Sequence, residues 1–150
     1  MTNPVEVKKI LVPLDFSEFG KEALELAQNW ALKFGATLHL LHVIDLRDLY
    51  STNPQEMESS VMLENILREK AEKELKNYSQ NLKVKSESEI RLGSPLEEIE
   101  DCITEQKIDL IVIPTHGRTG LKHVLMGSTA EKVVRHASCP VLTLKPKFKN

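Results

Sequence analysis

Short apolar runs alternate with amphipathic stretches of helical period along the whole chain, and this alternation constrains the fold more than any other feature. Five runs have the character of buried or edge strands, at residues 10–14, 37–43, 84–92, 109–114 and 141–144. Between these runs, apolar residues recur at steps of three and four. A strand–helix alternation of this kind predicts an α/β fold with a parallel sheet and helices on both faces.

The helical stretches carry start and stop signals. The first is expected to begin after an N-cap at Ser17 and to end at Gly35, with an apolar stripe made of Phe19, Ala23, Leu26, Ala27, Trp30 and Phe34. The second has its stripe at Leu63, Ile66, Leu67, Ala71, Leu75 and Tyr78. Two capping boxes, at 94–97 and 128–131, predict where the remaining helices start.

The strands differ in polarity, which predicts their order in the sheet. The runs at 10–14 and 109–114 are the most apolar and should be central and adjacent, whereas 84–92 alternates with charged residues and should be an edge. With right-handed crossovers, the order 3-2-1-4-5 satisfies these constraints. Ligands of such sheets bind beyond the carboxyl ends of the strands at the switch point, here residues 13–15 and 114–117.

Composition excludes several classes of protein. The 150 residues include 20 Lys and Arg against 22 Asp and Glu, a formal net charge of −2, which is unlike a dedicated nucleic-acid binder. No apolar run approaches the ~20 residues of a membrane span. Cys102 and Cys139 are too few for a disulfide framework and are expected to be reduced. We expect a soluble, cytoplasmic protein with one domain over residues 1–150 and frayed tails at 1–7 and 146–150.

Two segments near the switch point are candidates for ligand binding. Gly127-Ser128-Thr129 opens the last helix, where unpaired backbone N–H groups and the helix dipole favour an anion such as phosphate. The alternative is that Ser128 only caps the helix and Gly127 only makes a turn. Asp15 either accepts hydrogen bonds from a ligand or helps to hold a metal, or it caps the first helix together with Ser17.

The histidines have two interpretations. His116 and His123, with Arg118 and Lys122, either stabilise phosphate charge or form a solvated basic loop, and the second is favoured. His39 and His42 are expected to be satisfied residues of the strand at 37–43, on opposite faces of the sheet. No metal-ligand spacing, phosphate-binding lysine loop or nucleophile elbow is present, and no catalytic residue is predicted.

Several blocks of the chain resemble the universal stress protein family and follow the same order. They lie at 9–17 (KILVPLDFS), 41–45 (LHVID), 93–95 (GSP) and 115–142, which contains THGRTGL and ends in CPVL. The likeness spans nearly the whole chain and is most specific over 115–141. It implies a flavodoxin-like fold, a homodimer and, in one branch of the family, bound ATP.

That branch carries a Gly, two residues, a second Gly, nine residues and then Gly-Ser or Gly-Thr. Gly117 matches the second Gly and Gly127-Ser128 matches the end, but Pro114, which has no N–H and a fixed φ, replaces the first Gly. The resemblance places adenine against Val43 and acidic contacts at Asp15. The nucleotide-binding residues that it implies are Pro13, Leu14, Asp15, Val43, Gly117, Met126, Gly127, Ser128 and Thr129.

The expected function is therefore a regulatory module that binds an adenine nucleotide, with ATP as the leading choice and Mg²⁺ held through phosphates rather than side chains. One alternative is a nucleotide-free dimeric interaction protein, with Pro114 marking the loss of the site. Another is a slow ATPase. In each case the homodimer is expected to form by antiparallel pairing of the last strand with its copy, through Val141, Leu142, Thr143 and Leu144.

Overall fold

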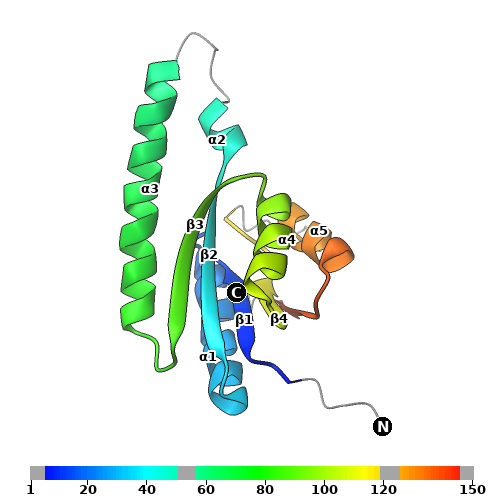
Figure 1. The fold of residues 1–150 in the computed structure, drawn as a ribbon. Coiled ribbons are helices and arrows are strands. Elements are labelled where there is room, and N and C mark those ends of the chain that lie inside the picture. Colours follow the sequence, from blue (N-terminus) through cyan, green and yellow to red (C-terminus); the bar gives the residue numbers. More distant parts are fainter. Residues whose placement is uncertain (1–5, 51–56, 119–125, 146–150) are drawn as a thin grey trace, which may run out of the picture.

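A computed structural model describes residues 6–50, 57–118 and 126–145 of the chain. It contains one parallel five-stranded sheet in the order β3-β2-β1-β4-β5 (Figure 1). The strands are β1 (Lys9–Pro13), β2 (Thr37–Asp45), β3 (Ser86–Gly93), β4 (Leu110–Pro114) and β5 (Val141–Leu144). The predicted fold class and strand order are thus confirmed.

The described residues form five helices, four of which cover the two faces of this sheet. They are α1 (Glu18–Phe34), α2 (Leu46–Tyr50), α3 (Met57–Gln80), α4 (Pro95–Gln106) and α5 (Ser128–His136). Helices α1 and α3 pack on one face and α4 and α5 on the other, so that each face has its own apolar cluster (Figure 1). The short helix α2 follows β2 directly, and the residues between α2 and α3 are not described.

The buried face of α1 differs from the predicted stripe. Small residues face the sheet, whereas the aromatic rings at Trp30 and Phe34 are 37% and 42% exposed and contact each other, with ring centroids 5.3 Å apart. Small side chains let the helix approach the strands closely, which places the large rings at its flank. The buried residues of α1 are Gly20, Ala23, Leu24, Ala27 and Ala31.

Helix α3 follows its predicted stripe only in its C-terminal half. Ala71 and Leu75 are buried, but Leu63 is 37% and Ile66 52% exposed. The helix has 24 residues and is ~36 Å long. The neighbouring strand β3 has 8 residues and spans only ~26 Å. One end of α3 therefore extends beyond the sheet, as Figure 1 shows, and its apolar positions find no strand to cover them.

The observed helix caps confirm the predicted limits of α1 and correct the two predicted capping boxes. Ser17 caps α1 by accepting a hydrogen bond from Gly20 N, and Gly35 ends that helix at a φ of 67°. Ser94 makes no side-chain cap bond, although Pro95 starts α4 as expected. Gly127, not Ser128, is the N-cap of α5, so Ser128 already lies inside the helix and cannot form the predicted capping box.

The remaining expectations concern the chain ends, the cysteines and the membrane. Of the tail predicted at 1–7, only Glu6 and Val7 are described, and Val7 packs against the α1-side cluster instead of fraying; the tail at 146–150 lies outside the described residues. Cys102 and Cys139 are both free thiols. Among the described helices, none is long and apolar enough to cross a membrane.

Candidate functional site

The two central strands separate at their carboxyl ends. β1 and β4 are paired at Ile10 with Leu110 and at Leu11 with Ile111, whereas β1 stays paired with β2 as far as Pro13. Pro13 and Pro114 end the two diverging strands. Neither has a backbone N–H, so the separation leaves no donor of these two residues without a partner. The crevice predicted at the switch point is therefore present.

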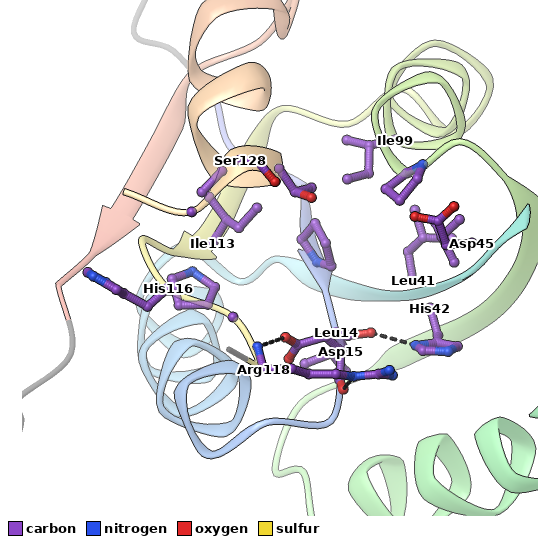
Figure 2. A pocket seen from close by; sticks show the side chains of 18 of the residues that line it. Leu14, Asp15, Leu41, His42, Asp45, Ile99, Ile113, His116, Arg118 and Ser128 are labelled. Atoms are coloured by element: carbon purple, nitrogen blue, oxygen red, sulfur yellow. Dashed lines mark hydrogen bonds between the residues drawn. The ribbon is translucent and has the colours of Figure 1, made fainter. Parts of the chain in front are cut away.

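A cavity of about 300 Å³ occupies this crevice. This volume is at the lower end of the range for small-molecule sites. Its walls come from the ends of β1, β2 and β4 and from the first turns of α4 and α5 (Figure 2). Apolar side chains, among them Leu41, Ile99 and Ile113, form one part of the lining, and polar groups at the ends of the strands form the rest.

The first turn of α5 presents unused backbone donors to the cavity. The first hydrogen bond within the helix runs from Glu131 N to Gly127 O, at 2.9 Å. The N–H groups of Ser128, Thr129 and Ala130 therefore have no partner inside the helix, no side chain of the described residues caps them, and all three residues line the cavity. Gly127 N is not available, because it donates to Thr115 O at 2.6 Å. This donor set fits an anionic group such as a phosphate.

Asp15 holds the loop after β4 against the loop after β1. Its Oδ1 accepts hydrogen bonds from Ser17 N and Ser17 Oγ, at 3.0 and 2.6 Å. Its Oδ2 accepts from Arg118 N at 2.9 Å, while Arg118 Nε donates to the Asp15 carbonyl (Figure 2). A Cβ at Gly117 would lie 2.9 Å from Oδ2, so a larger residue there would displace the Asp15 carboxylate. Both interpretations of Asp15 are thus compatible with its position, since it supports the α1 cap and faces the cavity.

His42 connects the cavity to the opposite face of the sheet. Its Nδ1–H donates to Leu14 O at 2.7 Å, and its ring stacks on Phe16 with centroids 4.4 Å apart. Phe16 in turn stacks on Tyr78 of α3. Burial lowers the pKa of His42, and the charge of Arg118 acts in the same direction, so the ring is neutral at pH 7. The prediction of a satisfied His42 is confirmed.

The basic loop differs from its favoured interpretation. His116 is buried, 5% exposed, where a solvated loop residue was expected. Its Nδ1 lies 2.8 Å from Thr115 Oγ1, and its ring makes an edge contact with Phe19. The position directly after β4 brings it under α1, which explains its burial. Lys122 and His123 lie outside the described residues.

Eight of the nine implied nucleotide-binding residues line the cavity. Met126 does not, and packs instead against the apolar cluster under α4 and α5. Sequence reasoning missed Leu41, His42, Asp45, Asp48, Pro95, Ile99, Ile113 and Ala130. One signal could have found two of them, because Pro95 and Ile99 lie four residues apart on one face of α4.

Comparison with known proteins finds universal stress proteins that match nearly the whole chain. A universal stress protein from Methanocaldococcus jannaschii, MJ0531, is 36% identical over 141 residues, covering 92% of this chain and 82% of the relative. The solved structure of another protein of that organism, MJ0577, has a TM-score of 0.87 and 35% identity, covering 97% of this chain and 100% of that one.

A more distant structure shares the fold. It is a universal stress protein family protein from Arabidopsis thaliana with AMP bound, at a TM-score of 0.60 and 23% identity, covering 93% of this chain and 92% of that one. The model of the universal stress protein family matches residues 6–145. With the strand order, the crevice and these relatives in agreement, the chain belongs to the universal stress protein family.

Proposed function

We propose that this protein is a regulatory module that binds an adenine nucleotide, ATP with Mg²⁺, in the crevice between β1 and β4. The observation that carries the proposal is the set of unpartnered N–H groups at Ser128, Thr129 and Ala130, which face a cavity in the described part of the chain. Phosphate oxygens are the ligands best suited to such a helix end. Because Gly127 N is already bonded, the donors begin one residue later than the motif alone suggested.

The charges along the cavity give the nucleotide a direction. Ser128 and Asp45 lie at opposite sides of the cavity in Figure 2. The hydrogen bond from Arg47 lowers the pKa of Asp45, and the two residues form an ion pair without net charge, so this side of the cavity offers phosphate no excess positive charge. The phosphates thus belong at the α5 end, where Arg118 can also reach them, and the uncharged base belongs at the other end.

The base and sugar have suitable neighbours in this orientation. Val43, Leu41 and Ile99 offer an apolar wall for adenine, with the backbone of Val43 at its rim. Asp15 Oδ2 accepts one hydrogen bond, from Arg118 N, and has a second lone pair for a ribose hydroxyl. The AMP bound by the Arabidopsis relative supports an adenine nucleotide as the ligand class. Mg²⁺ would bridge phosphate oxygens.

A nucleotide-free role is the second candidate, and Pro114 is the observation that favours it. Pro114 is buried in the cavity wall and offers no N–H to a ligand. In that case the family fold would serve only as a dimeric interaction surface.

Ligand identification separates the two candidates. Protein purified without added nucleotide is denatured, and the released small molecules are identified by mass spectrometry. We expect adenine nucleotide near one equivalent, and binding of labelled ATP, AMP and cyclic AMP then ranks the three. No released nucleotide, together with no thermal shift on adding Mg-ATP, would establish the nucleotide-free candidate.

A glycine substitution tests where the phosphates lie. Gly127→Asp places a negative charge at the α5 N-terminus and should weaken ATP binding at least 100-fold with the fold intact by circular dichroism. Gly127→Ala is the matched control, since it adds the same Cβ, 3.3 Å from Thr115 O, without charge. We expect it to bind within tenfold of wild type. Unchanged ATP affinity in Gly127→Asp would contradict the phosphate assignment.

We also propose a homodimer through β5. This strand pairs with β4 on one side and has no partner strand on the other among the described residues. Its four residues, Val141 to Leu144, carry no charge that would block pairing.

A further inference from the structure

A second polar site lies beneath α4 at the β3 side of the sheet, next to the crevice but outside the cavity lining. His39 of β2, Glu89 of β3 and Cys102 of α4 bring one nitrogen, one oxygen and one sulfur together, with all three atoms within 4.8 Å of one another. His39 Nε2 is 3.0 Å from Glu89 Oε2, and Cys102 Sγ is 4.0 Å from the same oxygen. His39 and Cys102 are buried, and Glu89 is half-buried.

We propose that His39, Glu89 and Cys102 form a binding site for Zn²⁺. Imidazole nitrogen, thiolate sulfur and carboxylate oxygen are the three protein ligands of this ion. In tetrahedral coordination such ligand atoms lie about 3.3–3.6 Å apart, so the distances found here require only small side-chain movements. The mixed nitrogen and sulfur donors disfavour Mg²⁺ and Ca²⁺, which prefer oxygen ligands.

The unpartnered nitrogen of His39 is the second observation that supports the site. His39 Nδ1 is buried and has no hydrogen-bond partner, although Glu87 Oε2 lies 3.5 Å away. A buried polar nitrogen without a partner is unfavourable, and the hydrogen bond between His39 Nε2 and Glu89 leaves this atom unexplained. With Zn²⁺ on Nε2, the neutral ring carries its proton on Nδ1, and a slight approach of Glu87 completes a carboxylate–histidine–metal arrangement.

The surrounding charges hold the ligands in place. Arg91 Nε donates to Glu89 Oε1 at 2.7 Å, which leaves Oε2 facing His39 and Cys102. Lys9 Nζ donates to Glu87 Oε2 at 3.3 Å and keeps that carboxylate beside the ring. Arg91 and Glu87 are thus positioning residues for the metal ligands. Since β3 is an edge strand and Glu87 is exposed, ions can reach the site from the open side of the sheet.

Metal binding releases one proton. The Zn–S bond forms as the Cys102 thiol proton goes to solvent, and the proton that Nε2 shares with Glu89 is replaced by one on Nδ1.

The experiment uses tag-free, nucleotide-free protein and Co²⁺ as a spectroscopic substitute for Zn²⁺. We expect one equivalent of Co²⁺ to produce a thiolate-to-cobalt charge-transfer absorption with the visible bands of tetrahedral Co²⁺, and Zn²⁺ to displace it. Cys102→Ser should abolish the charge-transfer absorption, whereas Cys139→Ser should retain it. The second variant is the matched control, because it removes the other free thiol, which is outside the cluster.

Two further variants test the ligand His39 and the carboxylate of Glu87 beside its ring, by zinc competition with a chromophoric chelator. Glu87→Gln should weaken Zn²⁺ binding about 10- to 100-fold, and His39→Gln should weaken it more. No charge-transfer absorption in the wild type would overturn the proposal without reference to any variant. Persistence of the absorption in Cys102→Ser with its loss in Cys139→Ser would overturn it as well. Neither result depends on whether the crevice binds nucleotide.

Discussion

The two edge strands of the sheet, β3 and β5, differ in how their side chains affect pairing with another chain. β3 has eight residues and carries Glu87, Glu89 and Arg91, whereas β5 has four residues and carries no charge. Charges along an edge discourage pairing with another chain, and an apolar edge invites it. The β3 edge is covered by an ion-pair network that extends under α4, whereas the β5 edge keeps unpaired backbone groups, as the proposed dimer requires.

The directions of the N–H and C=O groups of β5 show which residue to change in order to test the proposed dimer. The carbonyl groups of Pro140 and Leu144 accept from Ile111 N and Thr115 N of the β4 segment. Because backbone groups alternate along a strand, Thr143 directs its N–H away from β4, towards the open edge. Proline at this position therefore removes the N–H group that the proposed dimer would use. The hydrogen bonds between β4 and β5 are kept.

Thr143→Pro should raise the dimer dissociation constant at least 100-fold and yield a folded monomer at tens of micromolar. Analytical ultracentrifugation measures the change, and Thr143→Val, which keeps the N–H, should remain dimeric. A dimer unchanged by Thr143→Pro would place the interface elsewhere, and a monomeric wild type would contradict the dimer itself.

Removing the central cation of the β3 edge, Arg91, should lower the stability of the fold. Arg91 pairs with Glu89, Glu98 and Glu105, and its side chain is only 10% exposed. Arg91→Met leaves these carboxylates without their cation and should lower the free energy of unfolding by about 3 kcal/mol in urea titrations.

Arg135→Met is the control for this loss. Arg135 pairs with Glu131 on the exposed surface of α5, and the expected change is under about 0.5 kcal/mol. Equal losses in the two variants would show that the β3 network behaves as an ordinary surface and would remove the contrast between the edges.

The two edges should also respond differently to acid. Burial acts to raise the pKa of Glu89, but hydrogen bonds from Arg91 and His39 outweigh it, so the pKa is lowered; the hydrogen bond from Lys9 lowers that of Glu87. The unfolded state thus binds protons first as pH falls below the ordinary value of 4.5, and this part of the stability is lost.

Unfolding free energies measured between pH 6 and 3 should show this decline, and Glu89→Gln should make it shallower. The dimer dissociation constant should stay constant wherever the protein remains folded, because no residue of β5 titrates. A decline of equal slope in Glu89→Gln would assign the acid sensitivity to other groups.

The smallest effect concerns the crevice between the two edges. Pro114→Gly restores an N–H at the end of β4, and one neutral hydrogen bond is worth about 1 kcal/mol. We expect ATP affinity to stay the same or rise by less than tenfold in equilibrium binding. Binding at least tenfold weaker in a variant of unchanged stability would make Pro114 a favourable contact with the ligand.

Much of the fold follows from local patterns in the sequence. The strand polarities are enough to place β1 and β4 in the centre and β3 at an edge, since burial on both faces requires continuous apolar runs. The end of α1 follows from Gly35, which adopts a positive φ of 67°. The crevice follows as well, because strand order alone decides where neighbouring crossovers diverge.

The tertiary structure alone decided the contacts between segments that are distant in the sequence. Such contacts leave no local pattern of residues. The closeness of α1 to the sheet selects its small residues for burial and exposes Trp30 and Phe34. The overhang of α3 depends on the length of its neighbours, and the start of α5 at Gly127 depends on the bond to Thr115 O. His39, Glu89 and Cys102 meet only because β2, β3 and α4 pack together, so no spacing along the chain reveals them. Periodicity determines which surfaces can be buried, whereas packing determines which side chains meet there.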